Sequence, residues 1–67
     1  SDVCSSDLAI AIAHELTGLS LTNIGKHFGN RDHSTVLHSV DKIKKRVEEE
    51  AEIKSDYELI KLKLANL

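Results

Sequence analysis

Apolar residues recur every three or four positions through the second half of the chain, and this spacing constrains the fold more than any other feature. It marks two stripes: Val36, Val40, Ile43 and Val47, then Ile53, Tyr57, Ile60, Leu64 and Leu67. At about 100° per residue each stripe lies on one side of an α-helix, but the second lies about 100° round from the first if one helix continues. We therefore predict two helices with a break or kink in residues 48–52, both stripes facing the core. A continuous bent helix is the alternative, because neither glycine nor proline marks the break.

The first half of the chain predicts further helices. One begins after Asp7 as its N-cap, is predicted to be buried on nearly all sides, and ends at Gly18, which tolerates the left-handed conformation. The next follows the N-cap Ser20 and ends at residues 29–30. It is only about two turns long, so it needs packing on its neighbours. The helix that carries the first stripe begins at Asp32, whose carboxylate can accept hydrogen bonds from the first turn.

Composition favours an all-α fold. The 67 residues include no proline, three glycines and two aromatic side chains, which favours helices joined by short turns over a β-sandwich. A chain of this length forms one small domain with little room for a deep substrate cavity, which disfavours an enzyme. We predict a small helical domain of about four helices over residues 8–67, and we interpret residues 1–7 as an atypical segment that need not be native.

Charge is unevenly distributed, although the net charge is only −2. Residues 17–46 contain six lysines and arginines against two aspartates, whereas the rest of the chain contains three lysines against nine acidic side chains. A polyanion would therefore bind the middle of the chain and be repelled by its ends. A solvated helix with mixed charges is the alternative explanation.

The basic middle also has the layout of a helix-turn-helix, with two predicted helices joined by a short turn that contains glycine. Such a unit reads DNA with the first residues of its second helix, which here are Arg31, Asp32, His33, Ser34 and Thr35. These types can hydrogen-bond base edges, but they are also common at ordinary helix starts. The side of this helix away from the stripe is polar and basic and carries Ser34, Thr35, His38, Lys42 and Lys45.

A longer run of residues gives a more specific indication of function than the helix-turn-helix layout. Residues 24–38, IGKHFGNRDHSTVLH, resemble the signature of the C-terminal domain of DnaA, the bacterial chromosomal replication initiator, and the resemblance extends over roughly residues 8–67. It implies sequence-specific binding of double-stranded DNA at DnaA boxes of the replication origin. By this resemblance the base-contacting residues are Asp32, His33, Ser34 and Thr35. The phosphate-contacting residues are Arg31, for which a guanine is the alternative ligand, Leu21 through its backbone, Lys26, Lys42 and Lys45.

The sequence also departs from the family. Relatives usually carry a basic loop before the first helix whose arginine enters the minor groove, whereas residues 1–7 are acidic and contain no arginine. Asp41 stands where relatives often have a basic residue, and His14 where a lysine is common. We therefore expect weaker affinity than in a typical member, with base preference retained.

The resemblance implies two partners, the DnaA box and the remainder of the initiator with its ATPase module. The phosphate-loop motif of such a module does not occur in this chain. We expect no cofactor, no membrane partner and a monomeric fragment. A single cysteine, Cys4, and the lack of a signal peptide predict a reducing, cytoplasmic compartment.

Two other functions are alternatives to DNA binding. A zinc site is disfavoured because one cysteine supplies at most one thiolate and the three central histidines do not repeat on one helix face: His27, His33 and His38. The stronger alternative is a helical protein-interaction module without sequence-specific DNA binding. It would dock its partner through residues 48–50 or through the end of the second stripe, Ile60, Leu64 and Leu67.

Overall fold

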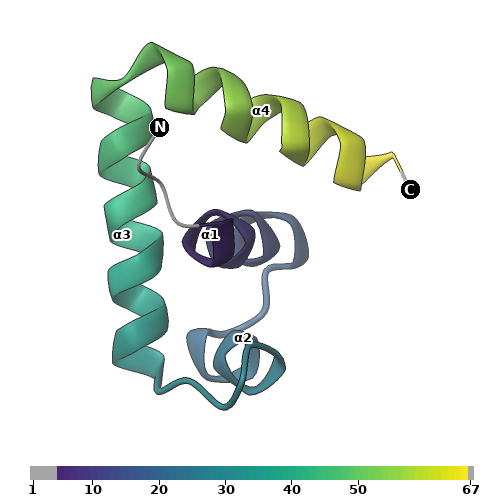
Figure 1. Ribbon diagram of the computed structural model, residues 1–67. Coiled ribbons are helices and arrows are strands. Elements are labelled where there is room, and N and C mark those ends of the chain that lie inside the picture. Colours follow the sequence, from purple (N-terminus) through teal and green to yellow (C-terminus); the bar gives the residue numbers. More distant parts are fainter. Residues whose placement is uncertain (1–4, 67) are drawn as a thin grey trace.

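The computed structural model describes residues 5–66, which form four α-helices. These are α1 (Ser5–Thr17), α2 (Leu21–His27), α3 (His33–Glu49) and α4 (Ala51–Ala65). The helices α1 and α2 lie along one flank of α3, and α4 turns away from the end of α3 and passes over α1 (Figure 1). The predicted all-α class and the number of helices are confirmed.

Local chemistry explains most helix ends. The Ser20 hydroxyl accepts a hydrogen bond from the Asn23 N–H at 3.2 Å, so the predicted N-cap of α2 is confirmed. Gly18 follows α1 with a φ of 69°, as predicted for a glycine at a helix end. The predicted start of α1 was wrong, because the helix begins at Ser5 and Asp7 lies inside its first turn. Asp7 does not cap α1, since its carboxylate bonds to side chains of α3 instead.

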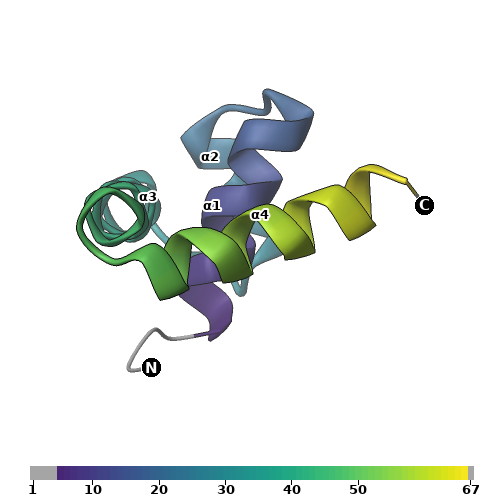
Figure 2. The same ribbon diagram turned by 90° about the horizontal axis from the view of Figure 1, so that it is seen from above.

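The predicted break between the two stripes is confirmed at a single residue. Glu50 has an extended backbone, with φ −127° and ψ 111°, and it separates α3 from α4. Its N–H donates to the Arg46 carbonyl at 2.8 Å, its carboxylate pairs with the Arg46 side chain, and its carbonyl accepts from the Lys54 N–H at 3.0 Å. Seen along the axis of α3, α4 leaves sideways across α1 (Figure 2). The continuous bent helix is therefore excluded.

The core lies where α1, α2 and α3 meet. One cluster unites Ile10, Ile24, Val36 and Val40, with Ala13, Leu21 and Phe28 partly buried against it. Ile43 is also buried and Val47 partly so, which confirms that the first stripe faces the interior. This cluster holds the short helix α2, which could not be stable alone.

Two burial predictions were wrong. In α4 only Ile53 is buried, and Ile60 and Leu64 remain 37% and 45% exposed, while Leu67 lies outside the described residues. In α1 Leu16 is 41% exposed, so this helix is not buried on all sides. The reason for α4 is geometric, because it crosses α1 at an angle (Figure 1), and Ile60 and Leu64 face α1 only across an open groove that they line together with Leu8 and Ile12.

Candidate nucleic-acid interface

The turn between α2 and α3 is organised by the backbone of Gly25. Its carbonyl oxygen accepts hydrogen bonds from the N–H groups of Phe28 at 3.2 Å and of Arg31 at 2.9 Å. Between them the chain reverses through positive φ angles at Gly29 (79°) and Asn30 (58°), which glycine and asparagine tolerate best. The turn thus places Arg31 at a defined position before the start of α3.

Gly25 is a functional candidate that the sequence analysis missed. It is buried inside α2, and a β-carbon built on it would lie 2.1 Å from the carbonyl oxygen of Arg31. A glycine inside a helix costs about 1 kcal/mol relative to alanine, so its presence in a predicted helix was the available signal. The structure supplies the reason, since no other residue leaves room for the returning chain.

The predicted reading residues form the tip of α3. All five, Arg31 to Thr35, are exposed. Asp32 occupies the N-cap position, but its side chain does not make the predicted capping hydrogen bond to the first turn of α3. Its carboxylate instead accepts a hydrogen bond from the Ser34 hydroxyl and lies 3.5 Å from Nδ1 of His33. The bond from Ser34 lowers the pKa of Asp32 further below neutral, and the side chain is an ionised acceptor at neutral pH.

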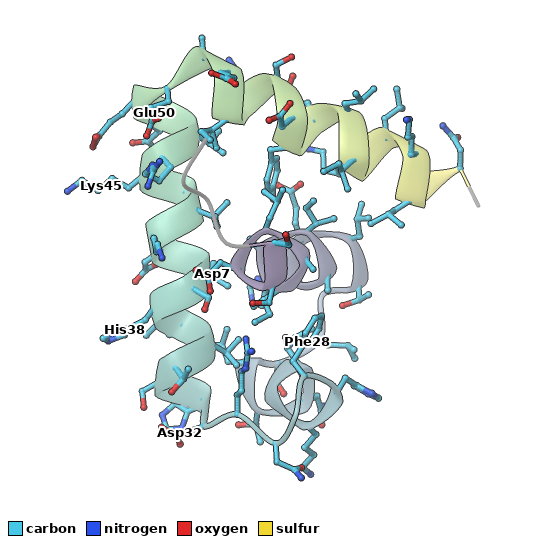
Figure 3. The ribbon with its side chains drawn as sticks, in the orientation of Figure 1. Asp7, Phe28, Asp32, His38, Lys45 and Glu50 are labelled. Carbon is cyan, nitrogen blue, oxygen red and sulfur yellow. The ribbon has the colours of Figure 1, made fainter. Side chains whose placement is uncertain are left out.

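The outer side of α3 continues this exposed surface. Figure 3 shows His38 and Lys45 pointing away from α1 and α2, above Asp32 at the start of the helix. Lys42 lies nearer the body, because its Nζ donates to Oδ2 of Asp7 at 2.9 Å. This ion pair, which the sequence did not reveal, offsets part of the positive charge that Lys42 could offer a phosphate.

Asp7 is the acidic partner that ties α1 to α3. Besides the lysine, its carboxylate accepts from the hydroxyl of Ser39 at 2.8 Å, and Ser39 is buried. The hydrogen bonds from Lys42 and then Ser39 lower the pKa of Asp7. The contact satisfies a buried hydroxyl, so it orders the middle of α3 against the first turn of α1.

The remaining predicted phosphate contacts lie on α2 and the turn. Lys26 and Arg31 are exposed. Leu21 is partly buried against the core, which leaves its backbone as the part available to a ligand. It is the first residue of α2, where the N–H groups have no partner within the helix.

A second polar cluster joins α4 to α1, away from the tip. Nζ of Lys61 lies 2.9 Å from Oε2 of Glu15 and 5.6 Å from the centre of the Tyr57 ring. Burial, and then the nearby Glu15 carboxylate, raise the pKa of Tyr57 to about 12. This cluster fixes α4 over α1.

Neither a membrane span nor a metal-ligand cluster emerges from residues 5–66. None of the helices in that range is both long and apolar enough to cross a bilayer. The same residues contain no group of three or more histidine, cysteine, aspartate or glutamate side chains placed to hold a metal ion.

Comparison with known proteins relates the chain to one family. Residues 5–43 match the family model for the bacterial dnaA protein helix-turn-helix. The chain is 48% identical over 61 residues to the chromosomal replication initiator protein DnaA of Limosilactobacillus fermentum, which covers 91% of the chain. It is 47% and 45% identical over 62 residues, or 92% of the chain, to the proteins of the same name from Geotalea daltonii and Streptococcus uberis.

These matches cover only part of each relative. The chain spans 14% of the length of each of the three initiator proteins. No solved structure matches the chain. The match to the family model includes α1, α2, the turn and α3 as far as Ile43, and therefore all the predicted site residues except Lys45. The chain thus belongs to the bacterial DnaA family and corresponds to its C-terminal helix-turn-helix domain.

Proposed function

We propose that this chain binds double-stranded DNA sequence-specifically at DnaA boxes, with the start of α3 inserted in the major groove. The observation that carries the proposal is the tip itself. Five consecutive hydrogen-bonding residues, Arg31 to Thr35, are exposed at the start of the second helix of a helix-turn-helix. This is the place from which such motifs contact base edges.

The chemistry of the tip supports a division of roles. The ionised Asp32 accepts from a cytosine amino group, and Ser34 and Thr35 donate to or accept from base edges. His33 lies beside them and completes the base-contacting set. These roles are consistent with the exposure of all four side chains.

Phosphate contacts would surround the tip. Arg31, Lys26 and Lys45 are exposed cations, and the first N–H groups of α2 at Leu21 suit an anion. Lys42 would have to exchange the carboxylate of Asp7 for a phosphate, so we assign it the weakest contribution of the three lysines. The domain itself is non-enzymatic, and ATP hydrolysis would belong to the part of the initiator outside this chain.

A binding titration tests the proposal. The protein is titrated with a duplex that carries a DnaA box and with the same duplex after the box is scrambled, each at two salt concentrations. We expect the box to bind at least about tenfold tighter, and both affinities to fall as salt rises. Equal affinity for the two duplexes would refute base recognition.

A protein-interaction module is the second candidate, and the exposed apolar side chains of α4 favour it. They are Leu59, Ile60, Leu62 and Leu64, between 37% and 60% exposed. The partner would be another part of the initiator, whose relatives are far longer than this chain. In the same titration this module would show neither a preference for the box nor a salt-dependent affinity for DNA.

A further inference from the structure

We infer that Gly25 is the positioning residue of the DNA-reading tip, because the Arg31 backbone rests directly on it and so fixes where Asp32 stands relative to the body of the fold. The inference rests on the proposed function and deepens it. Gly25 makes no contact with DNA in this view. It sets base discrimination by holding the tip in place.

The first step is that Gly25 contacts the backbone of Arg31 at two points. Its carbonyl oxygen accepts the N–H of Arg31 at 2.9 Å. Its α-carbon faces the carbonyl of the same residue, since a β-carbon would lie 2.1 Å from that oxygen and 3.1 Å from its carbon. Both peptide groups that flank the Arg31 α-carbon are therefore packed on one glycine.

The second step is that this contact cannot be relieved cheaply. The crowded atoms belong to the backbone of Arg31, so no rotamer change moves them away. A β-carbon requires a separation of at least 3.0 Å, which means that the Arg31 carbonyl must shift by about 1 Å. Since that carbonyl belongs to the peptide bond that leads into Asp32, the shift is passed directly to the N-cap of α3.

The third step is that the displacement stays local. The next nearest atom to the added β-carbon is Cγ2 of Val36 at 3.3 Å, a side-chain methyl that needs to give only a few tenths of an ångström. The other glycines differ, because a β-carbon on Gly18 or Gly29 would meet nothing within 4 Å. Their positive φ angles strain only their own backbone.

The variant Gly25→Ala tests the inference. Affinities for the DnaA box and for the scrambled duplex are measured below the unfolding transition, which circular dichroism locates. We expect the box affinity to fall at least about tenfold, because a site displaced by more than about 0.5 Å loses its hydrogen-bond geometry. The scrambled duplex should bind within about twofold of the parent, since exposed lysines still contact its phosphates.

Two further measurements separate positioning from loss of stability. Ile53→Ala is the matched control, because it truncates a buried side chain of α4 and should lower the unfolding temperature without changing the ratio of box to scrambled affinity. Amide chemical shifts of Gly25→Ala should change at residues 24–36 and remain near their parent values in α4.

Each outcome is decisive. An unchanged ratio in Gly25→Ala, or the same fall in ratio in Ile53→Ala, would overturn the inference. Loss of the helical signal in Gly25→Ala would overturn it too, since the glycine would then serve the whole fold and not the tip. Absence of any box preference in the parent chain would instead reject the proposed function, and the two failures are therefore distinguishable.

Discussion

The apolar stripes of α3 and α4 have the same spacing in the sequence but different positions in the fold. Three residues of the α3 stripe are almost fully buried, with exposed fractions of 0, 8 and 1%: Val36, Val40 and Ile43. The α4 stripe is buried at Ile53 and then becomes progressively more exposed towards Leu64. The difference shows that spacing sets which side of a helix is apolar, whereas burial requires another helix packed closely against that side.

The packing of the two helices explains the contrast. The inner side of α3 meets α1 and α2 along its first half, where the core cluster forms. In contrast α4 crosses α1 (Figure 2) and meets the body through its first turns and through Tyr57 and Lys61, whereas Ile60 and Leu64 face α1 only across an open groove. Since hydrophobic stabilisation scales with the apolar area removed from water, most of it must come from the three-helix part.

The largest effect is expected when a buried side chain of the α3 stripe is truncated. Ile43→Ala should lower the free energy of unfolding by about 2–5 kcal/mol, because it empties a fully enclosed site. The same substitution at Ile60, which is 37% exposed, should cost less than about 1 kcal/mol. Urea unfolding followed by circular dichroism measures both. Equal losses would mean that the end of α4 is packed as tightly as α3.

The next prediction contrasts the tip of α3 with an exposed position on α4. Asp32→Ala should weaken binding to the DnaA box by about 1–3 kcal/mol and relax base choice at the contacted position, with little change in stability because Asp32 is exposed. Asp56→Ala removes an exposed carboxylate from α4 and serves as the control, with no loss of box affinity expected. Anisotropy titrations with base-substituted duplexes provide the measurement. An equal loss on all duplexes would contradict base reading by Asp32.

A smaller effect is expected from the lysines. Lys45→Ala should weaken the box and the scrambled duplex equally and reduce the slope of log affinity against log salt by about 1. Lys63→Ala, on α4, removes the same charge at an exposed position remote from the tip and should leave the slope unchanged. Lys42→Ala should have less effect than Lys45→Ala, since Asp7 already pairs with Lys42 at 2.9 Å. DNA affinities of each variant measured over a series of salt concentrations would rank the three lysines.

The smallest expected effect concerns the part of α4 that does pack. Burial and Glu15 raise the pKa of Tyr57 from 10.0 to about 12, so the neutral phenol is the form the folded state favours. The resulting stabilisation is present below the pKa of the unfolded chain and is lost as pH rises towards 12. The chain has one tyrosine and no tryptophan, so the tyrosinate absorbance reports this group alone. A midpoint near 10 would show that Tyr57 is not packed against α1, and Tyr57→Phe should remove this pH dependence of stability.

Much of the fold could be predicted because its signals are local. The cap at Ser20, the positive-φ residues Gly18 and Gly29 and the change of stripe before Ile53 each act within one or two turns of helix. The tip at residues 31–35 could be singled out because it directly follows such a turn and lies within a specific string. Its base contacts remain a prediction.

The sequence by itself determined the number of helices, the breaks between them and the residues of the tip, but not the start of α1, because capping, glycine conformation and apolar spacing depend on neighbours along the chain. Only the tertiary structure decided that Asp7 pairs with Lys42, that the Arg31 carbonyl rests on Gly25, and that Ile60 and Leu64 stay exposed. Those outcomes depend on how the helices and the turn that joins them are placed in space. No local signal encodes that placement, because it follows from packing all the helices at once.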